Sequence, residues 1–212
     1  MTSLTAILCR FAALASFAAA GVALSPALAL AQEAPEALVK RVSQEVLQIV
    51  RTDPLVQAGN EARIHEVIEV KLLPNFDFVR MTSLAMGRNW RAATPEQQQR
   101  LTQEFRTLLV RTYSGALNQY RNEIVDYKPL RASPGDTEVV VRTVVAKPGA
   151  TPVPIDYSME KKADGWKAYD VAVAGVSLVT NYRDEFNAQI QAGGIDGLLK
   201  TLAAKNKGVA AK

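Results

Sequence analysis

The stretch TEVVVRTVVAK (residues 137–147), with TPVPIDYSMEKK (151–162) and GWKAYDVAVAG (165–175) after it, carries the clearest structural pattern of the sequence. All three segments are rich in β-branched and aromatic residues. In the middle one, apolar residues alternate with polar ones such as Asp156 and Ser158. Alternation with a period of two is typical of a strand that has one face in the core and the other in solvent. The pattern therefore predicts a sheet that is covered on one side only.

Turn signals separate these segments and join them to a fourth. EIVDYKPLRA (123–132) precedes them, and the links are SPGD (133–136), KPGATP (147–152) and ADG (163–165). Gly, Pro and Asp in short links are typical of turns, and ADG favours a tight hairpin. Four consecutive strands with short connections predict an antiparallel meander.

Helical spacing of apolar residues dominates the rest of the chain. The longest predicted helix starts at Thr94, where Pro95 and Gln97 complete a capping box, and runs to about Arg121. Gly193 and Gly194 are expected to end another helix. The predicted helices cover residues 35–50, 62–73, 75–87, 94–121, 177–192 and 195–205. Helices, then a four-strand meander, then helices indicate a single α+β domain, whose curved sheet is half-wrapped by helices around an apolar cavity.

The first 31 residues differ from the rest. Arg10 is their only charged residue, an apolar run follows it, and Ala29-Leu30-Ala31 forms a small-x-small cleavage signal before Gln32. This pattern is typical of a cleavable secretory signal peptide, with an uncleaved membrane anchor as the alternative. We therefore predict a signal peptide over residues 1–31, a folded domain over 32–206 and a disordered tail over 207–212.

Cysteine and charge exclude several classes of protein. Cys9 is the only cysteine and lies in the predicted signal peptide, so the mature chain has no disulfide and no cysteine-based metal site. The formal net charge of +4 falls by one when Arg10 is removed. The charges are well mixed, whereas nucleic-acid binding usually needs a concentrated basic stripe. We expect no nucleic-acid partner.

Ser177 is the first catalytic candidate, because it lies between a predicted strand and a predicted helix. A nucleophile elbow needs a small residue two positions after the serine, and that position is Val179. The one histidine of the chain, His65, precedes the serine, although the hydrolase order places it last. Ser177 is therefore predicted to be a helix N-cap. His65 has no companions at metal-ligand spacing, so no metal site is expected.

An isomerase site is the alternative that remains. An Asp base and a Tyr donor in an apolar cavity are sufficient for some isomerases, and the strands offer Asp156, Tyr157, Tyr169 and Asp170. Alternation, however, places each Asp on the face opposite its neighbouring Tyr. We expect no catalytic residue, and we expect Asp170 to pair with a cation such as Arg183.

Four stretches together resemble the MlaC family of periplasmic phospholipid-shuttle proteins, also called toluene-tolerance auxiliary proteins. The stretches follow the family's order and extend over essentially the whole mature chain: PNFDFVRMTSLAMGRNWRAATPEQ (74–97), EFRTLLVRTYSGAL (104–117), GWKAYDVAVAGVSLVTNYRDEF (165–186) and GGIDGLLKTL (193–202). The resemblance implies a helix-extended NTF2-like cone. It also implies a non-enzymatic lipid-binding domain that carries phospholipid as cargo and uses no cofactor.

The resemblance further implies a place of action and partners. The family works in the periplasm, between an inner-membrane ABC transporter with an MCE-domain protein and an outer-membrane lipoprotein–porin complex, and maintains outer-membrane lipid asymmetry. A family branch linked to hopanoid lipids shares the fold, so a hopanoid carrier is a second alternative beside the NTF2-like isomerase or hydrolase. We expect a monomer.

The lipid tails are expected to lie between the apolar face of the sheet and the long helix. The residues predicted to line this cavity are Phe105, Leu109, Tyr113, Val139, Val141, Val145, Ile155, Tyr157, Met159, Tyr169, Val171, Val173, Leu178 and Tyr182.

Overall fold

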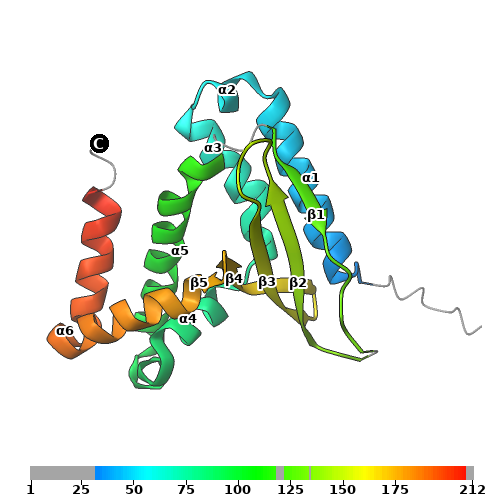
Figure 1. Cartoon of the computed structure of the whole chain (residues 1–212). Helices are drawn as coiled ribbons and strands as arrows, with labels where there is room; N and C mark the ends of the chain where they lie inside the picture. Colours follow the sequence, from blue (N-terminus) through cyan, green and yellow to red (C-terminus); the bar gives the residue numbers. More distant parts are fainter. Residues whose placement is uncertain (1–31, 118–121, 134, 209–212) are drawn as a thin grey trace, which may run out of the picture. The chain divides into compact units, whose positions relative to one another are not determined.

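The elements along the chain follow the predicted order of helices, strands and helices. The computed structural model describes residues 32–117, 122–133 and 135–208, which belong to one compact unit, so the predicted signal peptide lies outside the described residues. The elements are α1 (Pro35–Thr52), α2 (Pro54–Gln57), α3 (Glu61–Val67), the π-helix η1 (Ile68–Leu72), the 3-10 helix η2 (Leu73–Asn75), α4 (Phe78–Met86), the 3-10 helix η3 (Gly87–Ala92), α5 (Pro95–Leu117), β1 (Ile124–Tyr127), β2 (Glu138–Ala146), β3 (Val153–Lys162), β4 (Gly165–Val173), β5 (Val176–Ser177) and α6 (Leu178–Gly208) (Figure 1).

The sheet is an antiparallel meander in the order β1-β2-β3-β4-β5. The predicted α+β class is confirmed, and the four predicted strands are β1 to β4. The two-residue β5 is an addition, which pairs Val176 with Val173 after a turn at Ala174 and Gly175. Both turn residues have positive φ, 51° and 82°, as a tight hairpin of this hand requires.

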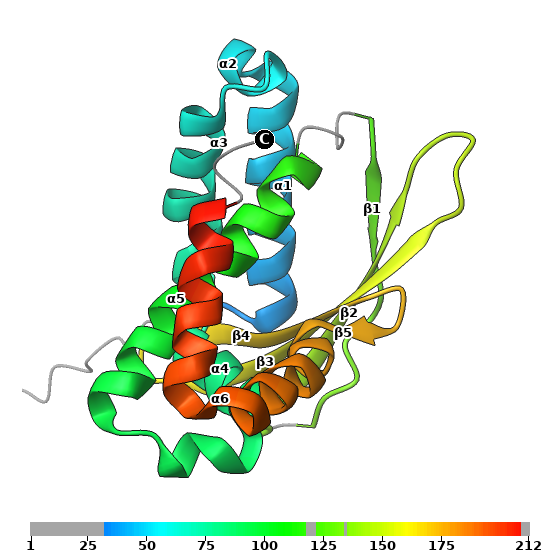
Figure 2. The ribbon, with the colours of Figure 1, turned by 90° about the vertical axis from the view of Figure 1, so that its left-hand side faces the viewer.

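One face of the sheet is covered by helices (Figures 1 and 2). Leu38, Val39 and Val42 of α1 pack on Val139 and Val141 of β2, together with Met159, Trp166 and Ala168 of β3 and β4. A second cluster joins α4, α5 and α6, in which Phe105 makes edge-on ring contacts with Tyr182 and Phe186 at centroid distances of 5.0 and 5.1 Å. A third joins the end of α1 to α3 and η1. Three separate clusters therefore form the core.

The helix ends agree with the sequence signals. Thr94 and Gln97 exchange side-chain and backbone hydrogen bonds of 3.0 and 3.2 Å, which is the predicted capping box. Asp77 caps α4 by accepting from the backbone N–H of Arg80 at 2.8 Å. Gly194, with φ 67° and ψ −172°, divides α6, so its second half turns back alongside α5 (Figure 2). The helix continues to Gly208, two residues into the predicted tail.

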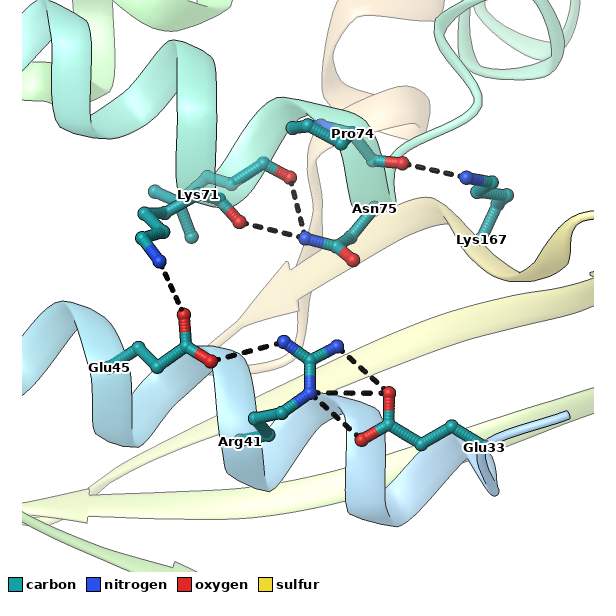
Figure 3. A network of polar contacts seen from close by, with 8 residues as sticks. Glu33, Arg41, Glu45, Lys71, Pro74, Asn75 and Lys167 are labelled. Atoms are coloured by element: carbon teal, nitrogen blue, oxygen red, sulfur yellow. Dashed lines mark hydrogen bonds and ion pairs between the residues drawn. The ribbon is translucent and has the colours of Figure 1, made fainter.

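A network of polar contacts holds α1 against η1 (Figure 3). Arg41 bridges Glu33 and Glu45 at 2.8 and 3.2 Å, and Lys71 of η1 reaches Glu45 at 2.9 Å. The Asn75 amide donates to the carbonyls of Lys71 (2.8 Å) and Leu72 (3.3 Å), which lie at the end of the π-helix. The exposed ion pairs contribute little stability each. The amide contacts satisfy carbonyls that an irregular helix end would leave unpaired.

Asp170 joins β4 to the start of α6. Its carboxylate accepts from the Ser177 hydroxyl at 2.6 Å and from the backbone N–H groups of Val171 (2.9 Å) and Val179 (3.1 Å). Ser177 in turn accepts from the Thr180 N–H at 3.0 Å, which is the predicted N-cap. The prediction that Asp170 pairs with Arg183 is wrong, because the Arg183 Nε donates to the Leu84 carbonyl instead. Asp170 is thus saturated by structural hydrogen bonds.

Replacing Asp170 with alanine should therefore lower the free energy of unfolding by about 2 kcal/mol, because a charge-assisted cap and two further hydrogen bonds are lost together. Asp184→Ala is the matched control, since Asp184 is an exposed carboxylate in α6 and should change stability by less than about 0.5 kcal/mol. Urea denaturation followed by circular dichroism measures both. Equal stability of the two variants would contradict the role of Asp170.

Candidate functional site

An apolar cavity of about 320 Å³ lies between the sheet and the helices. Its walls come from α1, η1, η2, α4, α5 and the first residue of α6 on the helical side, and from β1 to β4 on the other. The lining is Ser43, Val46, Leu47, Val50, Ile68, Leu72, Leu73, Phe76, Phe78, Met81, Leu109, Val110, Tyr113, Ser114, Val125, Val145, Ile155, Tyr157, Val171, Val173 and Leu178.

The lining contains few polar side chains. Of the described residues that form it, only Ser43, Ser114, Tyr113 and Tyr157 have polar side-chain atoms, and none is a carboxylate, a histidine or a cation. Burial raises the pKa of Tyr113 further above neutrality, with a smaller contribution from Tyr182, and so strengthens the preference of this phenol for its uncharged form. A cavity of this kind favours an uncharged, apolar ligand.

The cavity lies where the three core clusters meet. Met81 and Leu109 belong to the α4–α5–α6 cluster, Val46 and Val110 belong to the α1–α3–η1 cluster, and Tyr157 packs against the cluster beneath α1. Each wall is therefore supported from behind by close-packed side chains. Such a wall keeps the cavity from simply collapsing, because each lining residue is already fixed by other contacts.

The sheet is covered along only part of its length. At the β2 end that begins with Val139, α1 packs directly on the sheet and leaves no space. Farther along the same face, Val145, Ile155 and Val173 lie next to the cavity instead. A single strand thus has core residues toward one end and cavity residues toward the other, as β2 shows with Val139 and Val145.

The structure brings eight of the fourteen predicted cavity residues together in the lining: Leu109, Tyr113, Val145, Ile155, Tyr157, Val171, Val173 and Leu178. Five others are buried in the core. Phe105 and Tyr182 lie in the α4–α5–α6 cluster, and Val139, Val141 and Met159 lie beneath α1. Period-two alternation identifies the face of a strand correctly but does not indicate which part of that face a helix covers.

Tyr169 lies elsewhere for a different reason. Ser158 pairs with Asp170 but Met159 pairs with Ala168, so Tyr169 is an extra residue in β4, at a β-bulge. The bulge shifts the alternation by one, so that Trp166 and Ala168 point inward before it and Val171 after it. The Arg80 guanidinium instead lies over the Tyr169 ring, with its Cζ atom 3.7 Å from the ring centre. The Tyr169 hydroxyl donates to Glu138 at 3.1 Å.

Sequence reasoning missed most of the helical wall. Ser43, Val46, Leu47 and Val50 follow one another at the helical spacing of three and four, so α1 offered a signal of the same kind as the long helix. Ile68 and Leu72 come from the π-helix, whose wider turn has no simple sequence signature. Phe76 and Phe78 lie in the irregular entry to α4.

The groups considered for catalysis do not meet at the cavity. Asp156 lies on the solvent face of the sheet opposite Arg142, with 3.9 Å between the Arg142 Nε and an Asp156 oxygen. Ser177 and Asp170 are occupied as caps, and His65 lies in α3 outside the lining.

Among residues 32–117, 122–133 and 135–208, no group of three or more His, Cys, Asp or Glu side chains could hold a metal ion. In the same ranges, no helix is both long and apolar enough to cross a membrane.

The fold and the site together define an α+β protein with an apolar pocket enclosed between a meander sheet and a helical layer. The model of the family described as "MlaC protein" matches residues 40–204. The chain belongs to the MlaC family, as the sequence predicts.

Named relatives agree with this assignment. The chain is 28% identical over 172 residues to the toluene tolerance protein ttg2D of Pseudomonas putida, covering 81% of this chain and 80% of that protein. It is 20% identical over 174 residues to the intermembrane phospholipid transport system binding protein MlaC of Haemophilus influenzae, covering 81% of each. A solved phospholipid-binding protein of Ralstonia solanacearum, in complex with a phospholipid, matches with a TM-score of 0.78 and 43% identity over 82% of this chain and 98% of that one.

Core and cavity residues should respond differently to truncation. Phe105 is fully buried, so Phe105→Ala should lower the free energy of unfolding by about 3 to 5 kcal/mol. Ile155→Ala should lower it by less than about 2 kcal/mol, because Ile155 already faces open space and makes fewer contacts that can be lost. Guanidinium denaturation of protein stripped of small molecules by organic extraction measures the two values. A larger loss at Ile155 would show that the cavity is absent in solution.

Proposed function

We propose that this protein is a periplasmic phospholipid carrier, which holds the acyl chains of one lipid in the apolar cavity during transfer between membranes. The observation that supports this most directly is the lining itself, which is formed mainly by aliphatic and aromatic side chains and contains no charged group. The solved Ralstonia relative, 43% identical, was found with a phospholipid bound. Family membership supports the same function.

The energetics require a site of this kind. Exposing acyl chains to water costs about 0.8 kcal/mol per CH₂ group, so a free lipid crosses an aqueous space far too slowly. A dry cavity replaces the bilayer and makes the exchange nearly neutral in free energy. No catalytic group and no cofactor is needed for this, and the direction of transfer must come from the partners.

The lipid headgroup is proposed to remain at the polar end of the cavity. A recess lined by Arg51, Gln57 and Asn122 shares Val50 with the cavity lining. Arg51 donates to the Glu123 carbonyl at 2.7 Å, which ties the end of α1 to the start of β1 beside this recess. A phosphate placed there keeps polar contacts and water, and so avoids the cost of desolvating its charge.

The wider setting follows from the family. We propose that residues 1–31 are removed as a signal peptide and that the mature protein acts as a monomer. An inner-membrane ABC transporter with an MCE-domain protein and an outer-membrane lipoprotein–porin complex are the proposed partners, and outer-membrane lipid asymmetry is the proposed outcome.

Organic extraction and mass spectrometry of the purified native protein test the cargo directly. We expect close to one phospholipid per chain. Extracts without phospholipid from several preparations would overturn the proposal, and an extract that contains a hopanoid instead would identify the other lipid class.

Filling the cavity with a larger side chain tests whether the bound lipid lies there. Val173→Trp places an indole in the space beside Val145 and Ile155, so bound phospholipid should fall at least fivefold, an effect of about 1 kcal/mol or more. Val79→Trp is the matched control, because Val79 is 58% exposed on α4 and outside the lining. Unchanged lipid content in the folded Val173→Trp variant would show that the cargo lies elsewhere.

A further inference from the structure

A second recess of about 550 Å³ lies between α4, η3 and α6 and shares no lining residue with the apolar cavity. Its principal polar residues are Ser83, Arg88, Arg183, Asn187 and Gln191, and Gly87 lies among them. Two of the stretches that carry the family resemblance, 74–97 and 165–186, supply both of its arginines.

The recess carries positive charge that the described residues do not balance. Arg88 and Arg183 contribute two guanidinium groups, and no carboxylate is among the lining residues. Neither arginine has an Asp or Glu oxygen within 4.0 Å in the described part of the chain. Ion pairs are formed by Arg41, Arg63, Arg80, Arg106 and Arg142. Arg91 and Arg100 also form none among the described residues, but Arg88 and Arg183 differ from them because both line the same recess. Two unbalanced cations in one concave site attract an anion.

Arg183 is held in place before any ligand binds. Its Nε donates to the Leu84 carbonyl in the last turn of α4 at 3.1 Å, and the side chain is half-buried. A guanidinium that is fixed through Nε still has its two terminal nitrogens as donors, in a planar fork that matches two oxygens of one anion. Fixing the fork in advance also reduces the entropy that binding removes.

The surroundings leave room and add neutral hydrogen-bonding groups. The Asn187 Oδ1 accepts from the Asn89 amide at 2.9 Å, so the Asn187 side chain is oriented by a residue of η3. Gly87 has φ 55°, and a Cβ added there would meet no atom within 4 Å, so the recess is open at this position. Ser83 and Gln191 complete the polar rim.

From these features we infer that the recess is an oxyanion site for a phosphate group, separate from the cargo cavity and independent of what that cavity holds. Arg183 and Arg88 bind the phosphate oxygens from two sides, and Asn187 adds an amide donor. The headgroup of an anionic lipid and free phosphate share this chemistry. A bound phosphate would bridge α4 and α6, which also supply Met81 and Leu178 to the wall of the cargo cavity.

Titration with inorganic phosphate at constant ionic strength, followed by NMR of the ¹⁵N-labelled mature protein, tests the site. We expect saturable shifts of the Gly87 and Asn187 amide signals, and an affinity about tenfold weaker in Arg183→Gln and in Arg88→Gln, because each substitution removes a charged hydrogen-bond donor. Arg91→Gln is the matched control, since Arg91 is exposed on the same η3 helix but lies outside the recess. Equal affinities in all three variants, or no saturable shift, would overturn the inference.

Sedimentation with phosphatidylglycerol–phosphatidylcholine vesicles separates the two sources of phosphate. Vesicle binding that is lost in Arg88→Gln and Arg183→Gln but kept in Arg91→Gln supports the lipid headgroup. A positive phosphate titration without such vesicle binding supports free phosphate. Lipid content of the cargo cavity, measured on the same samples, should stay unchanged in all variants, so failure of the recess and failure of the carrier function are distinguishable.

Discussion

The uneven cover of one apolar sheet face is the constraint on which the rest of the structure depends. An apolar face must be removed from water, and α1 does this completely over Val139 and Val141 by direct packing. Toward Val145 and Ile155, the helices stand away from the sheet, and the cavity takes the place of packed side chains. The side chains that line the cavity make fewer dispersion contacts with the protein than core side chains do, and an apolar ligand can supply such contacts. The same sheet therefore forms part of the core at one end and the wall of the cavity at the other.

The bulge at Tyr169 allows β4 to contribute apolar side chains both to the packed core and to the cavity. Because it adds one residue, Trp166 and Ala168 face the packed part of the sheet, while Val171 and Val173 face the cavity from the same side. If Tyr169 were an ordinary residue of the ladder and not a bulge, alternation from Ala168 would place Asp170 and Ala172 inward, and a carboxylate would enter the apolar cavity. Asp170 instead turns to Ser177 and the start of α6. The bulge thus keeps charge out of the cavity and fixes the entry to the last helix.

Much of the fold was predictable because its signals are local. The capping box at Thr94, the break at Gly194 and the alternation in β3 each act within a few residues, and the structure confirms them. The cavity lining was predictable only in part, because it depends on which helix stops covering which strand, and that is set by contacts between distant segments. Val141 and Val145 look alike in sequence, yet α1 covers one and leaves the other at the cavity. Likewise, nothing in the sequence around Arg88 indicates that Arg183 meets it across a recess.

The turn at Gly194 has a consequence for when the protein can fold. It sends the last helical turns back against α5, where Leu198, Leu199 and Leu202 complete the buried cluster and the Asn206 amide donates to the Glu104 carbonyl at 3.0 Å. Residues 198–206 are thus needed to close the cluster that α5 begins. A partly synthesised chain would lack them and stay open. Contacts between segments 102 residues apart close a long loop, so this cluster forms late in folding.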